Sequence, residues 1–167
     1  MAYFIWLLRI IHIVGGVFWV GAALTMTLYI VPTIRATGEA GQKFMGQFMG
    51  KTNFTAVITT ASILNILAGF ILYGITSNWF TSAWSRTGPG MGFGIGAGFA
   101  LIGWVFGILI GRGNGQMAKL GAQIQGKPTA EQLASIQTLQ KNLGLYSKIN
   151  GTALIIAVIF MSIARYL

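Results

Sequence analysis

Four long apolar segments, separated by polar connections, constrain this chain more than any other feature. They cover approximately residues 4–32, 54–76, 92–111 and 149–167. A helix crosses the hydrocarbon core of a bilayer with about 20 mostly apolar residues, and each segment is long enough. Only 8% of the 167 residues are charged, whereas soluble proteins have about 25%. The sequence therefore predicts an all-α integral membrane four-helix bundle, with residues 1–167 forming a single transmembrane domain.

The positive charge of the chain, formally +9, lies mainly in two of the connections. The connections after the first and third segments hold eight of the eleven Lys and Arg residues. Such basic connections stay in the cytoplasm, so we expect a multi-pass protein of a bacterial-type inner (plasma) membrane with both termini outside. Because anionic lipids attract basic residues beside apolar segments, the lipid bilayer explains this charge. Nucleic acid is not expected as a partner.

Two connections also predict amphipathic helices. Residues 39–51 place two Phe and two Met residues on one stripe, as in a short interfacial helix on the membrane surface. In the last connection, Thr129 and Gln132 match a capping box. Apolar residues follow at helical spacing up to Tyr146. We expect this helix to run nearly continuously into the fourth segment and to pack on the bundle or on a partner.

The third segment is rich in glycine. Gly103, Gly107 and Gly111 repeat every four residues and so share one helix face. Small residues at this spacing let helix backbones approach closely in lipid. The pattern favours close helix packing, with room for a flat cofactor as the alternative.

Several kinds of chemistry are excluded by composition. The chain has no Cys and no Asp, and its two Glu residues, Glu39 and Glu131, fall in polar connections. Thiol catalysis, iron–sulfur clusters and paired carboxylates within the membrane are therefore ruled out. The candidate chemistry rests on the few polar residues of the apolar segments.

The first segment carries the most informative of these residues. Arg9 and His12, three positions apart, share a helix face with Trp19, and all three are candidate cofactor contacts. His12 is the only histidine, and it lies about 12 Å inside the segment at 1.5 Å per residue. An ionisable residue at this depth is a functional-site hypothesis: His12 is a candidate metal ligand to haem iron, with Arg9 pairing with a propionate. The alternative is a hydrogen-bonded bundle histidine beside an interface arginine.

Asn65 lies near the middle of the second segment. Its amide needs hydrogen-bond partners there, either on another helix or on a bound ligand.

The stretch Arg9-Ile-Ile-His12-Ile-Val-Gly-Gly-Val-Phe-Trp19-Val-Gly21 resembles the first helix of the CopD/HemJ-like superfamily of small four-helix membrane proteins. The later segments look most like its uncharacterised members. The resemblance implies haem b as cofactor and a ligating role for His12. The chain departs from HemJ-type proteins because it has no second histidine, so protoporphyrinogen oxidase activity is not expected. It lacks the Cys and Met clusters that copper handling would need.

Three functions remain open at this point. The first is a haem-b-binding membrane protein in electron transfer or haem handling. Its second axial ligand would come from a homodimer, from a partner, or from a ligand other than histidine. The second is a non-catalytic subunit or assembly factor of a larger membrane complex. The third is a transporter or channel for a small solute.

Overall fold

The computed structural model describes residues 2–124 and 126–167, which are almost entirely helical and contain no strand. Two short helices are α3 (Glu39–Lys51) and the 3₁₀ helix η2 (Ala83–Arg86). There are four long helical segments among these residues. The first is α1 (Ala2–Thr25), which continues through the π-helical turn η1 (Met26–Ile30) into α2 (Val31–Thr37). The others are α4 (Phe54–Thr76), α5 (Gly88–Gln123) and α6 (Ala130–Ile163), and α6 ends in the 3₁₀ turn η3 (Ala164–Tyr166). The predicted all-α bundle with short amphipathic helices is confirmed.

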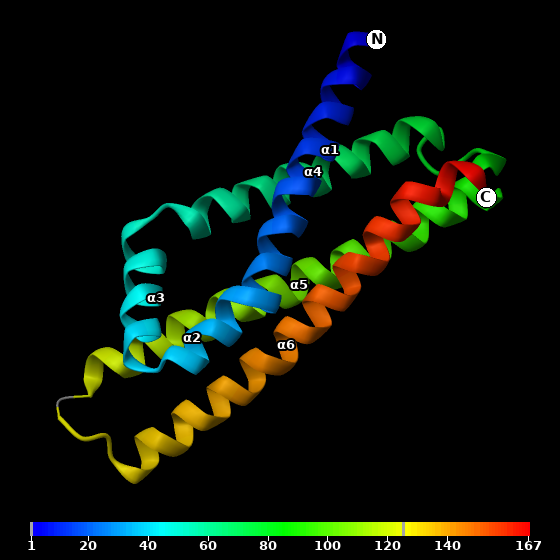
Figure 1. The fold of residues 1–167 in the computed structure, drawn as a ribbon. Helices are drawn as coiled ribbons and strands as arrows, with labels where there is room; N and C mark the ends of the chain where they lie inside the picture. The colour runs from blue at the N-terminus through cyan, green and yellow to red at the C-terminus, as the bar shows by residue number, and fades with distance from the viewer. Residues whose placement is uncertain (1, 125) are drawn as a thin grey trace.

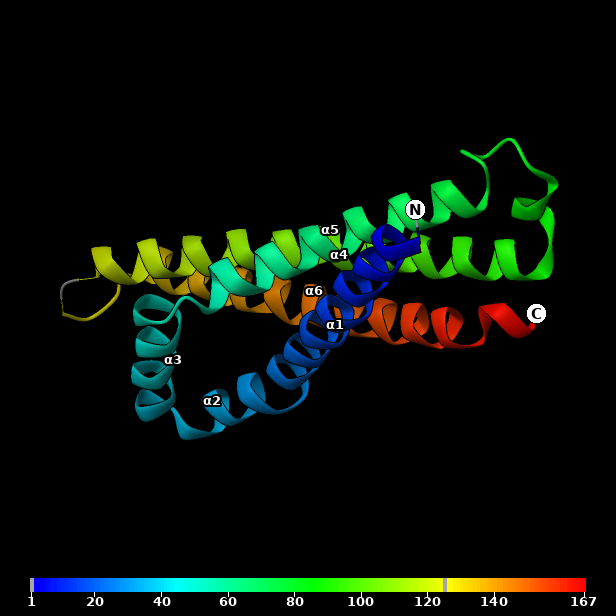
Figure 2. The same cartoon turned by 90° about the horizontal axis from the view of Figure 1, so that it is seen from above.

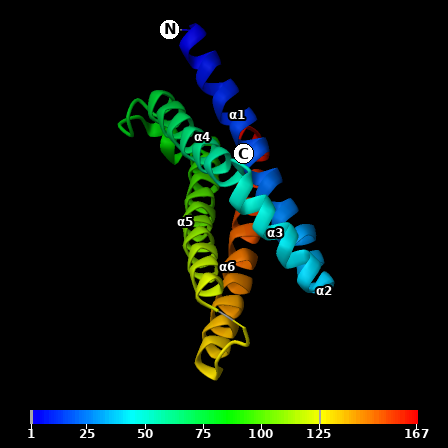
Figure 3. The ribbon, with the colours of Figure 1, turned by 90° about the vertical axis from the view of Figure 1, so that its left-hand side faces the viewer.

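The long helices form two pairs. Helix α5 packs along α6 as an antiparallel hairpin, and α1 packs on α4, whereas contacts between the pairs are few. Figure 1 shows α1 crossing α4, and Figure 3 shows that α1 does not run parallel to α5 and α6. In Figure 2, α2 and α3 lie toward the same end of the molecule as the end of α5 and the start of α6. We call this the basic end, because it carries most of the Lys and Arg residues.

The apolar faces of the long helices are mostly uncovered by protein. All four are long and apolar enough to cross a membrane, and within their most apolar windows only 11–33% of the residues are buried. Exposed apolar surface on this scale needs a lipid environment. The chain is therefore a membrane protein, with four helices among its described residues that are able to span the bilayer.

Two long helices extend further than the sequence predicted. The first does not stop at Pro32, because the π-helical turn before the proline accommodates its missing N–H and the helix continues to Thr37. The third continues past Gly111 to Gln123, where contact with α6 supports it: a methyl group added at Gly113 would lie 2.8 Å from Leu143 Cδ2.

The connections at the basic end fold as predicted. Helix α3 is present, and Gly38, with φ of +57° and ψ of −123°, makes the turn into it from α2. Only glycine adopts this backbone conformation readily. The Thr129–Gln132 capping box is confirmed by two reciprocal hydrogen bonds of 2.9 and 3.2 Å. Helix α6 then runs without a break into the last apolar segment.

Glycines of α5 form the seam with α6, in part as predicted. A methyl group on Gly103 would lie 2.7 Å from Leu154 Cδ2, so the helices meet closely there. The side-chain N–H of Asn150 also donates to the Gly103 carbonyl oxygen at 2.6 Å. Gly111 has no such neighbour within 4 Å, so the predicted repeat fails at this position. The seam instead uses Gly96 and Gly113 together with Gly103.

The connection from α4 to α5 folds back onto the end of α4. Trp79 packs on Gly74, where a methyl group would lie 2.8 Å from Trp79 Cζ3. The Tyr73 hydroxyl donates to the Gly90 carbonyl oxygen at 3.1 Å, which ties α4 to the start of α5. This contact joins the two helix pairs at the end opposite the basic end.

Candidate functional site

The site lies where α1 crosses α4, at positions occupied by small residues. A methyl group on Gly15 would lie 3.5 Å from the Ala61 carbonyl oxygen, and one on Gly16 would lie 3.1 Å from Asn65 Oδ1. These distances show that the two backbones approach closely, as small residues permit in membrane helices. The crossing sets His12, one helical turn before Gly16, against the next turn of α4.

His12 is held in one orientation by a hydrogen bond to α4. Its Nδ1 lies 2.9 Å from the carbonyl oxygen of Asn65. A carbonyl oxygen only accepts hydrogen bonds, so Nδ1 must carry the proton and donate. In a neutral imidazole this leaves the lone pair on Nε2. The histidines that bind metals are oriented in the same way, through a carbonyl or carboxylate on the other ring nitrogen.

Gly69 makes room for the imidazole. A methyl group at Gly69 would lie 2.6 Å from Cε1 of His12 and 2.8 Å from Nδ1, so the ring occupies the space that a side chain would need. Gly69 is one turn after Asn65 on α4. Two successive turns of α4 therefore fix the ring, one by a hydrogen bond and one by its missing side chain.

The side chain of Asn65 is a separate part of the same crossing. The residue is 6% exposed, and Oδ1 is buried without a conventional hydrogen-bond partner among the described residues. This oxygen faces the position of a Cβ on Gly16, and therefore an α-hydrogen of that glycine. Weak Cα–H···O contacts of this kind recur between packed helices. The Asn65 carbonyl thus orients His12, while its amide oxygen packs against α1.

Arg9 and Trp19 lie on either side of His12 along α1, in different environments. Arg9 is exposed and lies one turn toward the start of the helix. Trp19 is only 4% exposed and lies two turns, about 10 Å, further along. Of the predicted site residues, the structure brings His12 and Asn65 together, leaves Arg9 at the surface, and buries Trp19 in the helix packing.

The donor set of the site fits haem better than a free metal ion. The described residues contain no group of three or more His, Cys, Asp or Glu that could hold an ion. Haem needs less from the protein, because the porphyrin supplies the equatorial nitrogens and one imidazole is enough for an axial position. The residues present are a half-buried imidazole whose Nε2 makes no hydrogen bond among the described residues, and an exposed guanidinium one turn away.

Two residues that shape the structure were missed in the sequence. Gly69 follows Ala61 and Asn65 at four-residue spacing, a small-residue pattern that could have marked the contact face of α4. Asn150 is 3% exposed and hydrogen-bonded to α5. In the sequence it falls at the edge of the fourth apolar segment, where a polar residue is ordinary.

No protein-family model, curated protein or solved structure matches this chain.

Proposed function

We propose that this chain is a membrane haem b protein that serves electron transfer or haem handling, with Nε2 of His12 as an axial ligand. The hydrogen bond from Nδ1–H of His12 to the Asn65 carbonyl carries this proposal. It selects the tautomer that leaves the lone pair on Nε2, the arrangement found in histidines that bind metals. The resemblance of residues 9–21 to CopD/HemJ-like proteins points the same way.

Each residue of the site has a distinct part in this function. His12 ligates, and the Asn65 carbonyl and Gly69 hold its ring. Arg9 pairs with a haem propionate at the membrane surface, since guanidinium groups bind carboxylates by charge-assisted hydrogen bonds. Trp19 stabilises the packing of α1 on which the site depends. Bound haem supplies one-electron chemistry.

The placement in the membrane follows from charge. The basic end lies in the cytoplasm of a bacterial-type inner membrane, and the His12 site lies toward the outer surface, with both termini outside. The chain has a single histidine. A second histidine ligand would therefore have to come from a second copy or a partner.

The test is an absorption spectrum of the protein purified in mild detergent, oxidised and then reduced with dithionite. We expect a Soret band whose intensity corresponds to about one haem per chain or per dimer, and α and β bands after reduction. The Soret band should be lost in His12→Ala. Ile13→Ala is the matched control, because this neighbour of His12 is 62% exposed. A colourless wild type from cells supplied with haem precursor would contradict the proposal, as would a His12→Ala variant that keeps its haem.

A second function is favoured by the length of α5 and α6. These helices have 36 and 34 residues, whereas a bilayer span needs about 20, so their joined ends project as a hairpin from the basic end. Leu133 and Leu145 are both exposed on it. This hairpin would suit a non-catalytic subunit or assembly factor that docks on a larger complex. Loss of a copurifying complex in Leu133→Glu, with unchanged thermal stability and no haem in the wild type, would favour this function.

A further inference from the structure

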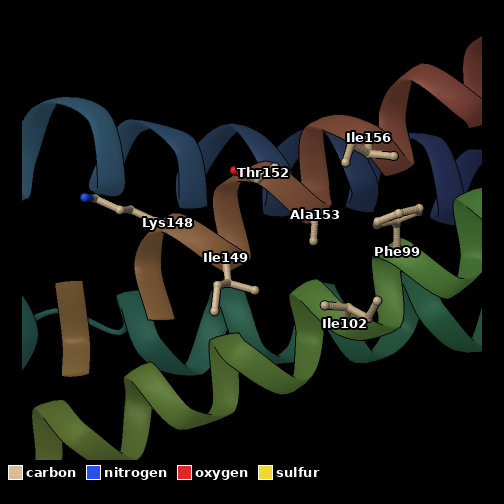
Figure 4. A pocket seen from close by; sticks show the side chains of 7 residues that line it. All are labelled: Phe99, Ile102, Lys148, Ile149, Thr152, Ala153 and Ile156. Carbon is tan, nitrogen blue, oxygen red and sulfur yellow. The ribbon is translucent and has the colours of Figure 1, made fainter. Parts of the chain in front are cut away.

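An apolar groove runs along the hairpin formed by α5 and α6, with a volume of about 290 Å³. Figure 4 shows its lining side chains, with Ala153 at the floor between side chains of α5 and α6. Among the described residues that line it, Thr152 and Lys148 have polar side chains. The lining comes from these two helices alone: Phe99, Ile102, Lys148, Ile149, Thr152, Ala153 and Ile156.

The end of the groove at Lys148 is positively charged. Arg35 of α2 reaches the turn of α6 just before it, where its Nη2 lies 3.5 Å from the position of a Cβ on Gly144. In the described part of the chain, neither of the two glutamates is paired with these cations. Glu39 is paired with Lys43 at 2.8 Å, and Glu131 lies 17 residues, about 26 Å, back along α6.

The depth of Lys148 matches the boundary of the hydrocarbon core. No charged residue occurs on α6 between Lys148 and Arg165. This interval of 17 residues spans about 26 Å along a helix, close to the hydrocarbon thickness of a bilayer. Lys148 therefore lies at the level of lipid phosphates, and the groove extends from it into the acyl-chain region.

We propose that this groove binds an anionic phospholipid, with an acyl chain over Ala153 and the phosphate between Lys148 and Arg35. Basic pockets beside membrane helices recognise anionic headgroups in this way. A second groove, of about 360 Å³, is lined by residues of α1 and α4 and serves as a comparison. Its lining residues, such as Val14, Phe18 and Leu64, are all uncharged, so it has no means of selecting a headgroup.

The experiment measures lipid binding to the full chain by native mass spectrometry, with phosphatidylglycerol and phosphatidylcholine of the same acyl composition. Wild type is expected to retain phosphatidylglycerol preferentially. Lys148→Gln should lower that preference about fivefold, the factor for one basic residue near an anionic surface. The matched control is Lys119→Gln, an exposed lysine of α5 outside the groove. Ala153→Leu, which fills the floor, should reduce binding of both lipids.

Equal retention of the two lipids by wild type would overturn the proposal, as would equal losses in Lys148→Gln and Lys119→Gln. A second copy in the groove would appear in the same spectra as a dimer without lipid preference, which would also overturn it. Lys148 is exposed, so its substitution should leave the lipid-free melting temperature unchanged. Any change in lipid binding can then be assigned to the headgroup contact.

Discussion

Gly69 is the residue at which the smallest chemical change should have the largest effect on the site. A single methyl group there would displace the His12 ring from the Asn65 carbonyl. Loss of such an orienting bond lowers metal affinity about tenfold to a hundredfold in known sites. We therefore expect Gly69→Ala to bind haem at least about tenfold more weakly in a titration followed at the Soret band.

Gly21→Ala is the control for this change, because a methyl group at Gly21 meets nothing within 4 Å. It should bind haem like wild type. Equal affinity of Gly69→Ala and Gly21→Ala would show that the position of the imidazole does not matter for binding.

A substitution at Asn65 can distinguish the role of its backbone carbonyl from that of its side chain. In Asn65→Leu the carbonyl that accepts from His12 is retained, and only the buried amide is lost. We expect unchanged haem occupancy. The free energy of unfolding should fall by only about 0.5–1 kcal/mol, because the weak contact to Gly16 is lost. The Soret-to-protein absorbance ratio and the unfolding midpoint measure the two effects. Loss of haem would assign the amide itself to the ligand.

At the scale of helices, Asn150 and Gly103 join α5 to α6. Asn150→Ala removes a buried 2.6 Å hydrogen bond and leaves the Gly103 carbonyl without its side-chain donor. Hydrogen bonds between membrane helices average about 0.6 kcal/mol and reach about 1.7 kcal/mol. We expect Asn150→Ala to lower the free energy of unfolding in mixed micelles by an amount within this range.

Thr152→Ala is the matched control on the same helix, since Thr152 is exposed and lies outside the seam. It should change the unfolding free energy by less than about 0.5 kcal/mol. A loss of equal size in both variants would mean that the Asn150 bond contributes nothing to the pairing of α5 and α6.

The existence and type of the helices could be predicted from sequence, but their lengths and partners could not. Apolar length identifies a span, and the Thr129–Gln132 pattern marks the start of α6, because both depend on local chemistry. Helix α5 continues past Gly111 because it packs on α6, which no local pattern reveals. Likewise His12 and Asn65 could each be singled out as polar residues in apolar segments. Their hydrogen bond depends on how α1 crosses α4, and the sequence does not encode that register locally.

At the scale of the whole molecule, the charge distribution predicts which end faces the cytoplasm. The chain has no Cys, so single cysteines can report the side without background. Ser135→Cys, on the hairpin of α5 and α6, should be shielded from a membrane-impermeant maleimide added to intact spheroplasts. Ala83→Cys, in the connection at the opposite end, should be labelled. Both residues are exposed, so both should react after the membrane is permeabilised. The reverse pattern would place the basic end outside.

The most direct test of the account is the protonation state of the single imidazole, read by ¹⁵N NMR of the haem-free protein labelled at histidine and held in lipid nanodiscs. His12 is the only histidine, so its two ring nitrogens give the only imidazole signals. Because Nδ1 donates to the Asn65 carbonyl, the neutral ring should carry its proton on Nδ1 and show Nε2 as the unprotonated nitrogen. Added haem should then perturb Nε2 most strongly. A proton on Nε2 with a bare Nδ1, or an Nε2 signal unmoved by haem, would contradict the central claim that α4 orients His12 for ligation.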